Sequence, residues 1–161
     1  MDETNGVVKQ TNLASAWRIQ AELVELPSKR KVKMTRPEAI TLMAESDEIP
    51  DTFFNLMVEA METGKNPTEG MSGVEMRSFL KTVTVLVTQI AIHHFVNPRV
   101  VTEGEAGEDE ITLAEVKAMS QSDKQFIMNF GMYGGEPTEL LSRFRNAEAK
   151  QLVASSDGKS I

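Results

Sequence analysis

The amino-acid sequence predicts a helix-dominated α+β fold, in which an N-terminal β-hairpin packs beside about six helices and a central helix is buried. Three observations support this prediction. The run from Ser72 to Val96 has apolar side chains at helical steps, two short alternating stretches flank a turn at residues 27–30, and several helical stretches begin at capping motifs.

The length and composition favour a single domain. The chain has 161 residues, 40% of them hydrophobic and 25% charged, so it can bury a core without disulfides or metal ions. We expect a flexible N-terminus over residues 1–12, a single globular domain over residues 13–152 and a polar C-terminal tail over residues 153–161. The first ten residues lack the basic and apolar regions of a secretion signal.

The N-terminal segment has the period of a β-strand. Alternate positions carry Trp17, Ile19, Ala21 and Leu23, interleaved with Arg18, Gln20, Glu22 and Val24. Residues 31–34 alternate again after the turn cluster at residues 27–30, which indicates a hairpin. Five cations fall within eight residues: Lys29, Arg30, Lys31, Lys33 and Arg36. A solvated outer face is the favoured interpretation of this cluster, and an acidic partner is the alternative.

The central run begins at Ser72-Gly73-Val74-Glu75, which matches a capping box. Apolar residues at helical spacing follow, with Pro98 as the stop: Met76, Phe79, Leu80, Val83, Val87 and Ile90. Residues 82–92 are rich in β-branched side chains and are also compatible with a buried strand, but the cap, the length and the proline favour a helix. This helix should be exposed at its start and enclosed later. Residues 82–98 contain Gln89 and two histidines, so we expect a core helix of a soluble protein rather than a membrane span.

Before the central run, two further helices are expected. A capping-box match at residues 35–38 predicts a short helix that ends near Ser46 and buries Ile40 and Met43. Pro50 is expected to start the next helix, which ends at Gly64.

Three helices are expected after Pro98. A capping box at residues 112–115 predicts a short helix to about Met119, and residues 120–123 lead into a second helix that Gly131 should close. A final amphipathic helix should begin at Pro137, with its apolar side chains at Leu140, Leu141, Phe144 and Ala147.

No residue pattern indicates catalysis, a metal site or a cofactor. The chain has no cysteine, and His93 and His94 are neighbours that point about 100° apart on a helix, so they cannot bind one metal ion together. The acidic loop at residues 103–110 matches no EF-hand spacing. A net charge of −7 disfavours nucleic-acid binding. We therefore expect a non-enzymatic protein that binds neither nucleic acid nor membrane.

Large apolar side chains near loops suggest a partner groove. The ten methionines favour an adaptable apolar surface, although most should serve as core filler. We hypothesise that some of six residues stay exposed and bind a partner. These residues are Phe53, Met57, Met61, Phe126, Phe130 and Met132.

The order of several short stretches resembles the tail assembly chaperones of long-tailed (siphovirus-type) bacteriophages, especially those that infect actinobacteria. The stretches are Ala16-Trp17 leading into Val24-Glu25-Leu26-Pro27-Ser28, then Ile49-Pro50-Asp51, Ile111-Thr112-Leu113, Asp123-Lys124-Gln125-Phe126-Ile127 and Leu140-Leu141-Ser142-Arg143-Phe144-Arg145. They span residues 16–145. The resemblance leads us to expect a glycine after Ser28, where this chain has Lys29.

The resemblance implies a protein of the host bacterial cytoplasm that coats the tape-measure protein during tail assembly and is absent from the mature virion. The implied partners are the tape-measure protein and the tail tube protein, with possible self-association, and no catalytic residues are implied. The alternatives are a phage virion structural protein of the neck, tail or capsid, or a small host-directed binding protein.

Proteins of this family are typically made in two lengths, the longer by a −1 ribosomal frameshift. A slippery GGGAAA core can encode Gly158-Lys159, so we expect this chain to be the shorter product. The nucleotide sequence across codons 155–161 tests this expectation.

Overall fold

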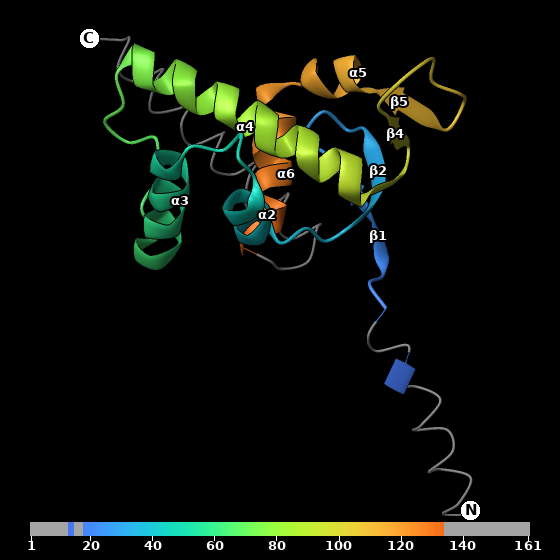
Figure 1. Ribbon diagram of the computed structural model, residues 1–161, viewed down its shortest axis with the longest axis horizontal. Coiled ribbons are helices and arrows are strands. Elements are labelled where there is room, and N and C mark those ends of the chain that lie inside the picture. Colours follow the sequence, from blue (N-terminus) through green and yellow to red (C-terminus); the bar gives the residue numbers. More distant parts are fainter. Residues whose placement is uncertain (1–12, 15–17, 134–161) are drawn as a thin grey trace, which may run out of the picture.

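A long helix, α4 (Gly73–His94), runs through the molecule (Figure 1). The computed structural model describes residues 13–14 and 18–133. Before α4 come the strands β1 (Ala21–Glu25) and β2 (Lys31–Thr35) and the helices α2 (Ala39–Glu45) and α3 (Asp51–Thr63). After α4 come β3 (Phe95–Asn97), β4 (Arg99–Val101), β5 (Glu110–Thr112), α5 (Leu113–Lys117) and α6 (Gln121–Tyr133). Of these elements, α2, α5, α6, β3 and β4 contact α4. The α+β prediction is confirmed, with five helices in the described part of the chain.

The central helix α4 begins at the predicted cap and is buried where the sequence predicted, but only one of the two bonds of the predicted capping box forms. The Ser72 hydroxyl accepts a hydrogen bond from the Glu75 amide at 3.2 Å, which satisfies one of the free N–H groups of the first turn. The first turns are exposed, and burial starts at Phe79; the buried side chains are Phe79, Val83, Leu86, Val87, Ile90 and Ala91. The predicted end was wrong: the helix stops at His94 rather than near Pro98, because residues 95–97 leave it to form β3.

The predicted hairpin is confirmed and forms part of a small sheet with the order β1-β2-β3. The strands β1 and β2 pair antiparallel with Val24 opposite Val32, and β2 pairs antiparallel with β3. Val24 and Val32 face the core, whereas Leu23 and Ile19 are 66% and 72% exposed. Ile19 and Leu23 of the apolar set that suggested the strand therefore point outward, because the inward face continues from Val24 to Leu26. A second sheet, the parallel pair β4 and β5, was not predicted.

The capping box expected at residues 35–38 does not form. Thr35 belongs to β2, and its hydroxyl lies 2.8 Å from Nδ1 of His94. The helix α2 instead follows Glu38, whose side chain makes no capping bond, and it buries Ala39 and Met43 while Ile40 is only half-buried. Burial of the His94 ring beside β2 lowers the pKa of His94, and the neighbouring His93 lowers it by a smaller amount.

The predicted C-terminal end of α3 and the predicted start of α5 are both confirmed. Gly64 closes α3 with a φ of 70°, and its amide donates to the Ala60 carbonyl at 2.9 Å. At the start of α5, Thr112 and Glu115 form a complete capping box.

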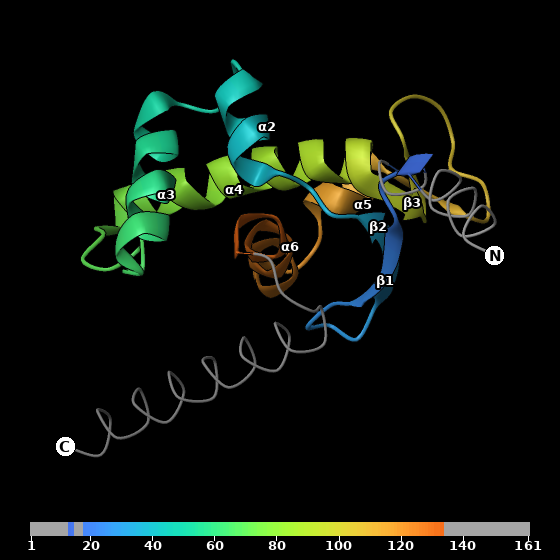
Figure 2. The ribbon, with the colours of Figure 1, turned by 90° about the horizontal axis from the view of Figure 1, so that it is seen from below.

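The predicted end of α6 was wrong. Gly131 does not close this helix, which continues to Tyr133. A Cβ atom on Gly131 would lie 2.8 Å from Cγ of Pro37, so the glycine allows the segment before α2 to approach α6 closely. Figure 2 shows α6 nearly end-on, running across α4 rather than alongside it.

Several expectations lie outside the described residues: the flexible segment 1–12, Trp17, the final helix with Leu140, Leu141, Phe144 and Ala147, and the tail at 153–161. Both domain boundaries therefore stay predictions. None of the helices within residues 18–133 combines the length and the apolar character that a membrane crossing requires.

Candidate binding groove

The six residues expected to form a partner groove do not form one exposed surface. Five of them belong to the core, because each is at most 6% exposed. These five are Phe53, Met57, Phe126, Phe130 and Met132. They lie on the inward stripes of α3 and α6, where Phe53 packs on Phe79 with ring centroids 5.3 Å apart. A single hydrophobic cluster contains these five side chains, so they cannot line a partner groove, and a binding role of the sixth stays a prediction. Only Met61 of the six is exposed, at 41%.

A different depression lies between the hairpin turn and α5, and we call it the hairpin–α5 groove. Its volume is about 410 Å³, against about 200 and 250 Å³ for two other depressions on the described part of the chain. The apolar lining comes from the hairpin, β3, Pro98, β5 and the two residues that follow α5, and consists of Leu26, Val32, Phe95, Pro98, Ile111, Ala118 and Met119. Charged side chains at its edge are Arg30, Lys31 and Glu115. An apolar floor with a few charged groups at the rim is typical of a binding site.

The hairpin turn on one side of the groove is held by a buried carboxylate. Asp123, which is 1% exposed, accepts hydrogen bonds from the Ser28 amide at 2.9 Å and from the Ser28 hydroxyl at 2.6 Å. These two bonds satisfy both oxygens of a group that would be costly to bury alone. They join segments 95 residues apart and thereby fix the turn against the start of α6.

The turn itself has a conformation that fits the Pro27-Ser28-Lys29 sequence except at its last residue. The Lys29 amide donates to the Leu26 carbonyl and the Leu26 amide to the Arg30 carbonyl, both at 2.8 Å. Lys29 has a φ of 72°, in the left-handed region that glycine adopts most easily. The position where the family resemblance leads one to expect glycine is thus the position that requires a positive φ. The turn sends Arg30 and Lys31 toward the groove.

Next to Asp123, Lys124 anchors α6 to a different neighbour. It is 4% exposed, and its Nζ donates to Oγ1 of Thr84 on α4 at 3.0 Å. Burial lowers the pKa of Lys124, because desolvation disfavours the charged ammonium. Consecutive residues therefore fix the start of α6 to the hairpin and to α4.

On the other side of the groove, the capping box of α5 occupies Glu115. Its carboxylate accepts the Thr112 amide at 2.9 Å, while the Thr112 hydroxyl accepts the Glu115 amide at 3.2 Å. Glu115 is thus tied to the helix end.

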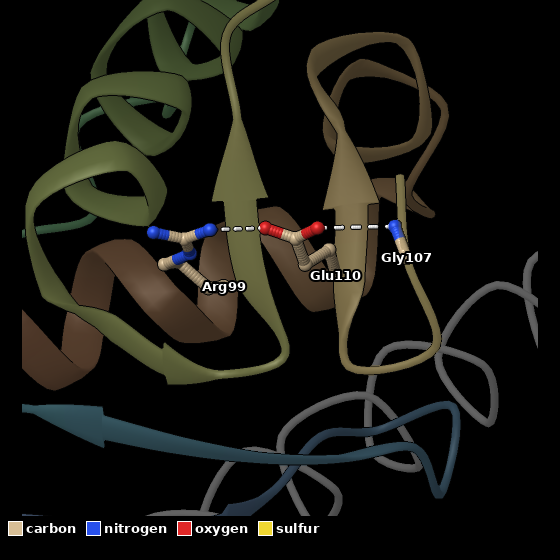
Figure 3. A network of polar contacts seen from close by, with 3 residues as sticks. All are labelled: Arg99, Gly107 and Glu110. Carbon is tan, nitrogen blue, oxygen red and sulfur yellow. Dashed lines mark hydrogen bonds and ion pairs between the residues drawn. The ribbon is translucent and has the colours of Figure 1, made fainter. Parts of the chain in front are cut away.

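The strand before α5 is fixed by a second carboxylate. Figure 3 shows Glu110 between Arg99 on β4 and the Gly107 amide, which donates to it at 3.1 Å. The Arg99 hydrogen bond is the main cause that lowers the pKa of Glu110, followed by the bond from Gly107. This contact ties β5, and with it Ile111, beside β4.

Within residues 18–133, no group of three or more acidic or histidine side chains is arranged to hold a metal ion, and the acidic loop at 103–110 is no exception. The two smaller depressions, of about 200 and 250 Å³, border α3. Comparisons with protein-family models, with curated proteins and with solved structures found no match.

Sequence reasoning missed most of the groove residues, although it noted two signals. The cation cluster at residues 29–36 was interpreted mainly as a solvated face, yet Arg30 and Lys31 line the groove. Two of the stretches that carry the resemblance also meet here, through Leu26 and Ile111 in the lining, and a third lies behind the turn, where Asp123 binds Ser28. What no local pattern could show is that these distant segments come together.

Proposed function

We propose that this chain is a tail assembly chaperone of a long-tailed bacteriophage and that its hairpin–α5 groove binds a segment of the tape-measure protein. One observation carries the proposal. Two of the stretches through which the chain resembles this family, residues 24–28 and 111–113, contribute lining residues to one groove, and a third, residues 123–127, holds the hairpin turn beside it through the Ser28–Asp123 bonds. The proposal is of a binding protein without catalytic residues that acts in the host bacterial cytoplasm.

The character of the groove suits this task. A chaperone that coats a long chain must accept many different segments and release them later, so it needs a shallow apolar surface rather than a closed pocket. The groove has an apolar floor that includes Met119, a side chain able to adapt to varied partners. The turn and α5 that border it are both anchored by hydrogen bonds. The binding surface is thus preorganised.

Co-expression with the tape-measure protein of the same phage tests this function. We expect the wild-type chain to keep the tape-measure protein soluble and to co-purify with it. Ala118 is exposed and lines the groove, so Ala118→Tyr should fill the groove without disturbing the core and should abolish co-purification. The matched control is Ala44→Tyr on α2, which is also exposed but does not line the groove.

Failure of the wild-type chain to retain the tape-measure protein would overturn the proposal. Mass spectrometry of purified virions adds an independent check, since an assembly chaperone should be absent from mature particles. Its presence there in stoichiometric amounts would favour the virion structural protein instead.

A further inference from the structure

The charges around the hairpin–α5 groove are uneven. Arg30 and Lys31 are exposed at its edge, and Lys29 and Lys33 are exposed beside them. Within residues 18–133, the ion pairs are Arg36 with Glu22 and Arg99 with Glu110, so neither Arg30 nor Lys31 is paired with a carboxylate of that part of the chain. On a chain of net charge −7, this edge concentrates positive charge.

One carboxylate lines the groove against two cations, so the lining keeps an excess of positive charge. Glu115 is the one acidic residue among the lining residues, and the capping box holds its carboxylate at the Thr112 amide. Glu25 faces Lys31 across the hairpin but does not line the groove. The acidic loop at 103–110 contributes no lining residue either.

We infer that the hairpin–α5 groove selects protein segments that combine apolar side chains with carboxylates. The apolar side chains of the segment lie over Ile111, Ala118 and Met119, which are at least partly exposed, and the carboxylates of the segment pair with Arg30 and Lys31. Charge pairs at a partly enclosed edge steer association and reject partners of the wrong sign. This inference rests on the proposed function and adds the chemistry of the segment that is bound.

The apolar floor argues for a protein segment rather than another polyanion. Nucleic acid offers the negative charge, but it binds through many phosphate contacts and through aromatic stacking surfaces. Phe95, the one aromatic side chain in the lining, is only 6% exposed and presents no open stacking face.

Fluorescence anisotropy with three matched peptides tests the inference on the full chain. The first peptide is a short amphipathic helix of leucine and glutamate, the second has lysine in place of glutamate, and the third has serine in place of leucine. We expect the first peptide to bind at least about tenfold more tightly than either of the others, and its binding to weaken with added salt. Equal binding of the glutamate and lysine peptides would overturn the inference.

A charge-reversed variant makes the test specific for the groove. Arg30→Glu combined with Lys31→Glu should reverse the preference, so that the lysine peptide binds more tightly. The control combines Arg77→Glu with Lys81→Glu, which makes the same charge change at exposed positions of α4 outside the groove. An unchanged preference in the groove variant, an equal effect of the control, or displacement of the peptide by single-stranded DNA would each contradict the inference.

The two proposals fail in different ways. If the chain retains the tape-measure protein but does not discriminate among the peptides, the inference is wrong and the function stands. If the chain discriminates among the peptides but does not retain the tape-measure protein, the chemistry of the groove stands and the proposed function is wrong.

Discussion

The two ends of α4 hold their neighbours by different means. At the C-terminal half, the hairpin and α6 are attached through hydrogen bonds between distant residues, which join Ser28 to Asp123, Lys124 to Thr84 and Thr35 to His94. At the N-terminal end, α3 rests on apolar contacts such as the Phe53–Phe79 pair (Figure 1). Between described residues, no side-chain hydrogen bond joins α3 to another element.

The difference shows which end can carry a defined binding site. Apolar contacts are non-directional and tolerate small shifts of a helix, whereas a buried carboxylate with two donors requires one arrangement. The groove lies at the end where the polar contacts fix the geometry. The comparison predicts that substitutions at this end cost more stability than matched substitutions on α3.

Truncating one leucine of α4 and one of α3 should give the largest difference in the free energy of unfolding. Leu86 of α4 is fully buried, and Leu86→Ala should lower the free energy of unfolding by about 2–5 kcal/mol. Leu56 of α3 is half-buried and borders two open depressions, so Leu56→Ala should cost only about 1 kcal/mol. Urea denaturation of both variants measures the difference. A loss below about 1 kcal/mol at Leu86 would contradict the central burial of α4.

Removing the buried carboxylate should have the next largest effect. Asp123→Ala deletes the acceptor of both Ser28 bonds and should cost roughly 2–3 kcal/mol, while Ser28→Ala deletes only the hydroxyl bond and should cost about 1 kcal/mol. The double variant should cost less than the sum of the two single variants, because the residues share one interaction. Strictly additive losses in a denaturation cycle would show that the two groups do not interact.

Sequence reasoning succeeded where the signal was local and failed where it was not. The caps at Ser72 and Thr112 and the glycine end of α3 depend on neighbours within four residues, and all three were confirmed. Thr35 had the same local cap pattern, but pairing in β2 and the contact with His94 took precedence. The strands β3, β4 and β5 have three residues each, too few for a period to show.

The candidate site was predicted less well than the fold. The hypothesised groove residues were large and apolar, which is also what a core requires, and nothing in the sequence separates Met61 at the surface from Met57 in the core except helical phase. The observed groove joins residues of the hairpin to residues of α5, and the Ser28–Asp123 bonds that support it cross 95 positions.

The close approach of the Pro37 ring to Gly131 provides a sharper test of the packing between α6 and the segment before α2. Gly131→Ala places a Cβ atom 2.8 Å from Cγ of Pro37 and should cost about 1–3 kcal/mol through overpacking, even though alanine favours a helix. Gly73→Ala is the matched control, since Gly73 begins α4 and has nothing within 4 Å of its added Cβ. This control should be neutral or slightly stabilising. Equal thermal stability of the two variants would show that α6 does not pack closely against the segment before α2.

The smallest expected effect concerns the turn that presents the cations to the groove. Lys29 adopts a φ of 72°, which costs a residue with a Cβ atom roughly 1–2 kcal/mol. Lys29→Gly removes that strain but adds freedom to the unfolded chain, so we expect a net gain of about 0.5 kcal/mol and a rise in melting temperature of about 1–2 °C. Lys29→Ala separates backbone from charge, because it keeps the strain and removes the ammonium, and its stability should stay near that of the wild type. If the alanine variant gained as much as the glycine variant, repulsion among the clustered cations would be the cause, and the left-handed turn would carry no strain.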